Sequence, residues 1–168
     1  VAAALAGARP RSRWRMEVSE RSDGLRVLND SYNANPESMS AALQTLAEFE
    51  PGRRGRRWAV LGDMLELGEV AAAEHAALGR RVAELEIDRL LAVGDHAEDV
   101  VFGARAAGMP SAHTQAYGSK DELAARLIAG VAGGDVVLVK ASRGLALDTV
   151  AAQLLAAPAR RYEREDPA

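Results

Sequence analysis

The chain has 168 residues, of which 48% are hydrophobic and 27% charged, and its 21 Lys and Arg against 24 Asp and Glu give a net charge of −3. This composition excludes a wholly disordered chain, and the apolar runs fall far short of the ~18 residues of a membrane span. The absence of cysteine excludes disulfides, a thiol nucleophile and cysteine-bound metals, while scattered histidines and the lack of a dense basic stripe argue against a metal site and a nucleic-acid partner.

The first predicted element is a hairpin. Residues 15–18 and 25–28 form two candidate strands around a tight turn at residues 22–24. From there, short β-rich runs alternate with segments of helical periodicity, which is the pattern of βαβ units. Further strands are predicted at residues 58–61, 89–93, roughly 112–116 and 136–139. Most of these runs lack a polar/apolar alternation, which suits strands that helices cover on both faces.

Helices are predicted after these strands. Asn35 and Pro36 mark one helix start, with a capping side chain followed by proline at the first helical position. Ser119 begins a capping box, Asp95 can cap a helix at 96–107, and Gly108 can end it. The other helices are expected at residues 71–85 and 147–155. We therefore predict an α/β protein: a Rossmann-like, doubly wound, mostly parallel sheet of about five to six strands with flanking helices and an N-terminal hairpin.

A ligand site is expected in the loops that follow the strands. In an open α/β sheet, ligands bind beyond the carboxyl ends of the strands. Three of the four loops there are dense in polar residues, whereas the opposite-edge connections have the composition of ordinary connectors. Neither G-x-G-x-x-G nor G-x-x-x-x-G-K-[ST] occurs in the chain. We therefore expect that it does not grip a triphosphate unaided by these means.

The loop after the first parallel strand carries Asp30, Asn33 and Asn35. These side chains suit amide and hydroxyl contacts with a base or a ribose. Asn and Asp also favour turns and helix caps for local reasons, and Asn35 can serve both as cap and as ligand contact. Within the helix at 71–85, His75 shares a face with Leu78, so we favour a core histidine over a catalytic base.

The loop after the last strand carries Lys140, Ser142 and Arg143. A point charge, a hydroxyl and a guanidinium fork together suit a phosphate or a substrate carboxylate. The alternative for Lys140 is a strand-ending lysine that reaches solvent. Asp63, after the second parallel strand, can contact substrate or fix its loop.

Three motifs carry a resemblance to a known family. They are the sequence of residues 30–36, the sequence of residues 60–68 with His75 and Gly79, and the sequence of residues 137–143. In this order they resemble the C-terminal domain of the Mur ligases, the amide-bond-forming enzymes of peptidoglycan synthesis. Among these, the sequence is similar to the branch that adds D-alanyl-D-alanine to UDP-N-acetylmuramoyl-tripeptide. The resemblance covers nearly the whole chain, from about Arg15 to Leu155.

The resemblance implies a role as one part of an ATP- and Mg²⁺-dependent ligase. Such enzymes phosphorylate the carboxylate of the UDP-linked tripeptide, and the amine of D-alanyl-D-alanine then attacks the acyl phosphate. The phosphate-binding loop and the magnesium ligands belong to a central domain, so we expect no catalytic residue in this chain and no activity of it alone. The expected partners are these small molecules and the enzyme's own N-terminal and central domains. We further expect a monomer and, because no signal peptide is visible, a cytoplasmic location.

The family's site residues carry over onto matching positions. The resemblance implies that Arg15 reaches the nucleotide and that the loop with Asp30, Asn33 and Asn35 contacts adenosine. For Arg15 the alternative is a solvated charge in an arginine-rich segment.

The acceptor side of the site also carries over, with two departures. Lys140, Ser142 and Arg143 match the segment that lines the acceptor amino-acid site, and Asp63 is a further substrate-binding candidate. Ala141 replaces a usual glycine, and residues 147–148 depart from a frequent Met-Glu, which puts any role of Asp148 in doubt.

The predicted domain boundaries follow. Residues 1–13 are the remnant of a central ATPase domain and linker, residues 14–157 are the C-terminal domain, and residues 158–168, which mix charges without an apolar face, form a disordered tail. Two alternatives stay open: a non-catalytic Rossmann-like or flavodoxin-like nucleotide-binding or docking module, and the C-terminal domain of another Mur ligase or a folylpolyglutamate ligase. The loop sequence at residues 32–35 argues against the second, because those relatives usually have a histidine there.

Overall fold

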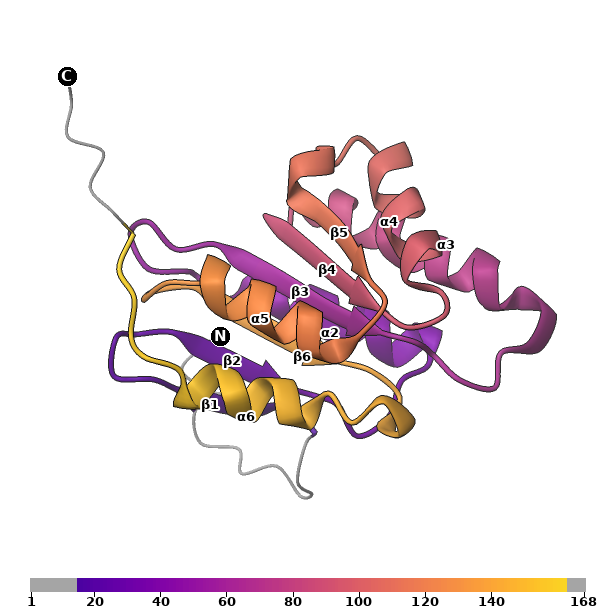
Figure 1. Ribbon diagram of the computed structural model, residues 1–168. Coiled ribbons are helices and arrows are strands. Elements are labelled where there is room, and N and C mark those ends of the chain that lie inside the picture. The colour runs from indigo at the N-terminus through magenta and orange to yellow at the C-terminus, as the bar shows by residue number, and fades with distance from the viewer. Residues whose placement is uncertain (1–14, 163–168) are drawn as a thin grey trace.

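The computed structural model describes residues 15–162, which form one six-stranded sheet covered by helices on both faces (Figure 1). The strand order is β1-β2-β6-β3-β4-β5. β1 runs antiparallel to β2, and all other neighbours are parallel. The strands are β1 (Glu17–Glu20), β2 (Arg26–Asn29), β3 (Arg57–Gly62), β4 (Arg89–Val93), β5 (Thr114–Tyr117) and β6 (Val136–Lys140). The predicted α/β fold with its N-terminal hairpin is confirmed.

Two apolar layers hold the helices on the sheet. One face carries α2 (Pro36–Glu48), α3 (Ala71–Glu84) and α4 (Ala97–Ala106), and the other carries α5 (Lys120–Gly130) and α6 (Asp148–Ala156). The central strand β6 is buried along its whole length. Burial on both faces explains the continuous apolar runs that predicted these strands.

Three of the predicted helix ends are confirmed, two of them by side-chain caps and one by a glycine. Asn35 caps α2, since its Oδ1 accepts from the Ser38 N–H and the Ser38 hydroxyl accepts from the Asn35 N–H. Ser119 caps α5 by accepting from the Glu122 N–H. Gly108 follows the end of α4 with a φ of +99°. The prediction that Asp95 caps α4 is wrong: His96 is the N-cap residue and makes no side-chain cap.

Two strands begin later than predicted. β1 starts at Glu17 instead of residue 15, because Met16 has a φ of +46° and cannot continue a strand. β5 starts at Thr114, because Ser111–His113 form a 3₁₀ turn in which the His113 N–H donates to the Pro110 carbonyl.

The C-terminal segment differs from the predicted disordered tail as far as Tyr162. The Tyr162 hydroxyl lies 2.6 and 2.7 Å from the two carboxylate oxygens of Asp135, and the Gly133 N–H donates to the Arg160 carbonyl. Burial, followed by the bond to Asp135, raises the pKa of Tyr162 well above that of a free tyrosine. Residues 163–168 and the predicted remnant at 1–13 lie outside the described residues.

Candidate functional site

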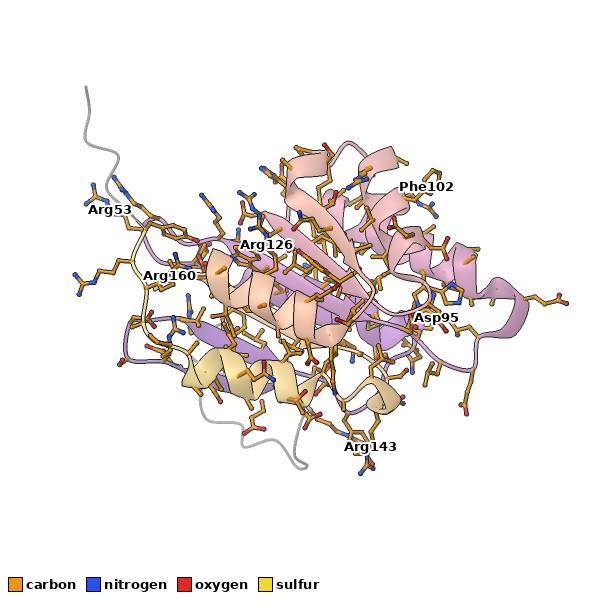
Figure 2. The ribbon with its side chains drawn as sticks, in the orientation of Figure 1. Arg53, Asp95, Phe102, Arg126, Arg143 and Arg160 are labelled. Carbon is orange, nitrogen blue, oxygen red and sulfur yellow. The ribbon has the colours of Figure 1, made fainter. Side chains whose placement is uncertain are left out.

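The loops that leave the carboxyl ends of β2, β3, β4 and β6 meet at one edge of the sheet. Figure 2 shows Asp95 and Arg143 at this end of the molecule and Arg53 and Arg160 at the other. The parallel register explains the meeting, because Asn29 of β2 lies opposite Val139 of β6. Residues 30 and 140 therefore come side by side although they are 110 residues apart.

A buried ion pair joins two of these loops. Lys140 is only 2% exposed, and its Nζ lies 2.6 Å from Asp30 Oδ2 and 2.9 Å from the Asn33 carbonyl oxygen. The other carboxylate oxygen of Asp30 accepts from the Met16 N–H at 3.1 Å. The Asp30 carboxylate therefore holds Lys140 on one side and the segment that carries Arg15 on the other.

Asp63 and Ser142 connect the loops of β3, β4 and β6. The buried Asp63 carboxylate accepts from the Asp95 N–H at 2.8 Å and from the His96 N–H at 3.1 Å. The Asp63 carbonyl accepts from the Ser142 N–H, and the Ser142 hydroxyl accepts from the Leu65 N–H, both at 3.0 Å. Asp63 and Ser142 therefore hold the backbones of these loops in place.

His75 of α3 holds the loop that follows β3 at the same edge of the sheet. It is fully buried, its Nε2 accepts from the Met64 N–H at 3.0 Å, and its Nδ1 lies 2.7 Å from the Ala71 carbonyl oxygen. An Nε2 that accepts leaves the proton of the neutral ring on Nδ1, which then donates to Ala71. The ring also stacks on His96 with centroids 4.5 Å apart. The predicted core histidine is confirmed.

A pocket of about 350 Å³ opens beside the buried ion pair. The two predicted sets contribute to it unequally: the nucleotide candidates and Lys140 line it, whereas Asp63, Ser142 and Arg143 do not. Its lining residues are Arg15, Met16, Asp30, Tyr32, Asn33, Asn35, Ser38 and Lys140. Both asparagine side-chain oxygens already accept backbone N–H groups, Asn33 from Ala34 and Asn35 from Ser38.

Tyr32 lies within the motif at residues 30–36 but was not among the predicted site residues. The Arg15 guanidinium lies over its ring at 4.5 Å from the centroid, and the Arg143 guanidinium lies over it at 5.5 Å. Tyr32 therefore brings the linker arginine and the arginine of the last loop to one place. An aromatic residue inside a loop of asparagines was the available signal, because an exposed aromatic ring binds cations and stacks on bases.

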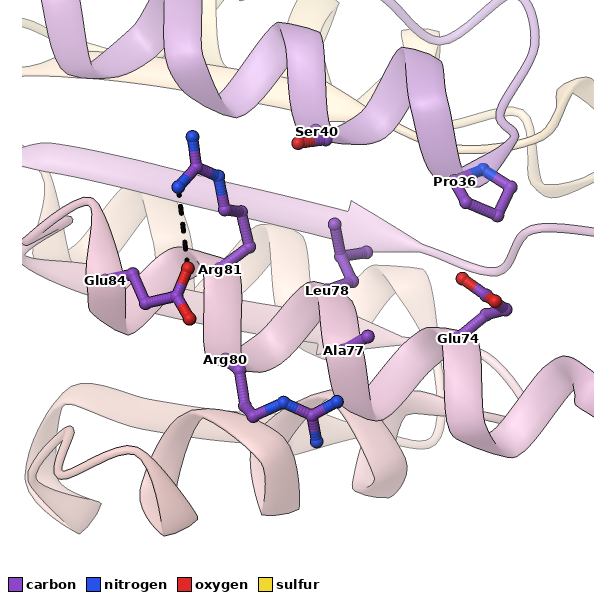
Figure 3. A pocket seen from close by; sticks show the side chains of 8 residues that line it. All are labelled: Pro36, Ser40, Glu74, Ala77, Leu78, Arg80, Arg81 and Glu84. Carbon is purple, nitrogen blue, oxygen red and sulfur yellow. Dashed lines mark hydrogen bonds and ion pairs between the residues drawn. The ribbon is translucent and has the colours of Figure 1, made fainter.

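Another cavity, of about 330 Å³, lies between α2 and α3 (Figure 3). Arg81 pairs there with Glu84 at 3.4 Å, and Arg80 and Glu74 lie along the same helix. Its walls are the surfaces of two amphipathic helices, and it has no share in the contacts described above.

Two classes of feature are missing from the described part of the chain. Among residues 15–162, no group of three or more His, Asp or Glu side chains could hold a metal ion. In the same range no helix has both the length and the apolar character needed to cross a bilayer.

A family model and curated relatives both match the chain to the Mur ligases. The family model described as Mur ligase, glutamate ligase domain, matches residues 14–143. The UDP-N-acetylmuramoyl-tripeptide–D-alanyl-D-alanine ligase of Mycobacterium tuberculosis is 45% identical over 93% of the chain, which covers 34% of that protein. The chain thus spans about a third of the length of the curated relatives it matches.

Solved structures agree with this match. A crystal structure of MurF from Acinetobacter baumannii superposes with a TM-score of 0.76 at 32% identity, covering 86% of the chain and 31% of that protein. The MurF ligase from Thermotoga maritima, solved in complex with ADP, gives 0.72 at 28% identity, with 90% and 32% covered.

Proposed function

Because the chain belongs to the Mur ligase family, we propose that it is the C-terminal domain of an enzyme that joins D-alanyl-D-alanine to UDP-N-acetylmuramoyl-tripeptide, acting in the cytoplasm. In that reaction ATP phosphorylates the tripeptide carboxylate with release of ADP, and the dipeptide amine then displaces phosphate to form an amide. The observation that carries the proposal is the meeting of Arg15 and Arg143 over the ring of Tyr32, which together with Arg15 lines one pocket.

The pocket suits the nucleoside part of ATP. Tyr32 offers a ring face, while the amides of Asn33 and Asn35 offer donors to a base or ribose. Arg15, at the pocket's rim, is placed to meet phosphate charge when another domain delivers the triphosphate. The described residues include no group of three or more His, Asp or Glu side chains that could hold a metal ion, and the proposal assigns the magnesium ligands to the rest of the enzyme.

Lys140 acts in this proposal by positioning the nucleotide loop. Its ammonium is enclosed and bonded to Asp30 and the Asn33 carbonyl, so it fixes the loop that contacts adenosine. Asp63 and Ser142 likewise shape the acceptor side by tying three loops together. Arg143, exposed and next in the chain, is then the cation offered to the dipeptide carboxylate.

The coding sequence upstream of Val1 gives the first test. A ligase of this type must bring a phosphate-binding G-K-[ST] loop from a preceding domain, since none is present in this chain. Finding that loop upstream supports the proposal, and an upstream sequence without it contradicts the proposal.

Arg143→Ala in the full-length enzyme gives the second test. Loss of a charged hydrogen bond costs about 1.5–3 kcal/mol, so the KM for D-alanyl-D-alanine should rise ~10-fold or more. Steady-state kinetics with each substrate varied in turn checks this. Arg53→Ala, at the opposite end of the molecule, removes the same charge and should leave the constants unchanged (Figure 2). A raised KM for ATP with an unchanged KM for the dipeptide would assign Arg143 to the nucleotide instead.

A further inference from the structure

A further polar cavity lies at the opposite end of the sheet, where β3, β4 and β5 begin. Its volume is about 210 Å³. Arg56 precedes β3, Arg89 opens β4, and Arg126 comes from α5. We call this cavity the arginine pocket; its lining also includes Trp58, His113 and Gln115.

The three arginines converge without a matching set of negative charges. Within residues 15–162, none of them makes an ion pair with a carboxylate. Arg56 lies over the Tyr162 ring at 4.8 Å, and Arg89 donates to the Asp88 backbone carbonyl at 2.9 Å. The closest side-chain acceptor of Arg126 is Gln115 Oε1, at 3.5 Å from Nε. Most of their donor groups therefore remain available.

The two nearby carboxylates are occupied by neutral donors. Asp135 is fully buried and accepts from the Trp58 indole, the Ala132 and Arg56 N–H groups and the Tyr162 hydroxyl. Burial raises its pKa despite these bonds. Asp88 accepts from the Arg57 N–H at 2.7 Å. Neither carboxylate forms an ion pair with the guanidinium groups of the three arginines.

The largest charge effects on Arg89 and His113 come from neighbouring arginines. Burial first and then the charge of Arg56 lower the pKa of Arg89, against smaller opposing effects of Asp88, Tyr162 and Asp135. Burial, Arg89 and Arg56, in that order, lower the pKa of His113, against a smaller opposing effect of Asp88. A bound anion would remove the repulsive part of both effects. The carbonyl end of α5 adds some negative charge there, but Arg160 already donates to the Ala129 carbonyl.

We propose that the arginine pocket is a second binding site, which takes a small anion carrying phosphate groups. Three guanidinium forks from three different segments match the oxygens of a phosphate or diphosphate, and each can donate two bonds. The pocket is at the amino ends of the strands, about 17–20 Å along β3 from the proposed nucleotide pocket. It therefore cannot be a subsite of that pocket, and it does not depend on the proposed ligase activity.

Titration of the 168-residue chain with inorganic pyrophosphate tests the proposal. Calorimetry measures the affinity, and NMR of the imidazole resonances locates the anion. Binding should raise the pKa of His113 and leave the imidazole resonances of His75, at the other edge, unshifted. Arg89→Gln and Arg126→Gln should each weaken binding about tenfold, while Arg80→Gln on α3 removes the same charge without effect. Arg143→Ala should also leave this affinity unchanged, which separates the site from the proposed active site.

The chain's own acidic end is the competing source of negative charge. Glu163, Glu165 and Asp166 follow Tyr162 in the sequence, so a variant that ends at Tyr162 must be titrated in parallel. Equal binding by both chains supports a site for a free anion. Binding only by the shortened chain, with a lower His113 pKa after the truncation, would overturn the proposal and assign the pocket to the tail. Binding that leaves the His113 resonance unchanged, or no binding by either chain, also overturns it.

Discussion

Replacing Lys140 with methionine should lower the free energy of unfolding by about 3–5 kcal/mol. The substitution keeps most of the apolar stem but leaves the Asp30 carboxylate, whose side chain is only 17% exposed, without its ion-pair partner. Removing one member of a buried pair costs this much because the remaining charge stays buried and uncompensated. Urea unfolding of the 168-residue chain, followed by circular dichroism, measures the loss.

The chain contains one other lysine, which makes the control direct. Lys120 opens α5 and takes no part in the ion pair, so Lys120→Met should change the unfolding free energy by less than about 0.5 kcal/mol. Asp30→Asn added to Lys140→Met removes the unpaired charge and should recover part of the loss, which a double-mutant cycle quantifies. A cost for Lys140→Met as small as that of Lys120→Met would contradict the buried pair.

Lys140 also shows which features of the site can be predicted from the sequence. Its place at the end of a buried strand was predicted, and the local pattern left open whether its side chain reaches solvent or a substrate. The choice depends on β2 and β6 being neighbours, which brings Asp30 to Lys140. Strand order is decided by packing between distant segments, so no local signal contains it.

The helix ends show the same difference between contacts with sequence neighbours, which can be predicted, and contacts with distant residues, which cannot. Asn35 and Ser119 cap helices that begin within three residues of them, and both were identified. Asp95 was assigned as a cap on the same reasoning, but the carboxylate that receives the loop's N–H groups is Asp63, 32 residues earlier in the chain. Tyr162 was placed in a disordered tail for an equivalent reason, since its partner Asp135 comes from another loop.

The arginine pocket was missed for the same physical reason. Arg56, Arg89 and Arg126 follow one another at separations of 33 and 37 residues, and each one alone has the appearance of a surface charge in a connector or on a helix. Only the parallel arrangement of β3, β4 and β5 brings their segments together. The polar loops at the carboxyl edge could be found because each concentrates its polar residues in a short stretch.

Gly79→Ala should destabilise the protein by ~2 kcal/mol or more, although helix propensity alone predicts the opposite sign. Alanine in a helix interior is normally about 1 kcal/mol better than glycine. A Cβ at Gly79 would lie 1.8 Å from the Val100 carbonyl oxygen, and one at Gly103 would lie 1.9 Å from the Ala76 carbonyl oxygen. The two glycines let α3 and α4 touch backbone to backbone, so an added methyl forces the helices apart.

The consequence should extend to the candidate site, because His75 lies one turn before Gly79 on the same face of α3 and holds the Met64 N–H. Thermal unfolding gives the stability change, and the His75 imidazole resonance reports whether its bond to the β3 loop is kept. Gly118→Ala is the matched control: a Cβ there meets nothing within 4 Å, so stability should be unchanged or rise by up to ~1 kcal/mol. A stabilised Gly79→Ala variant would mean that the two helices are not in backbone contact.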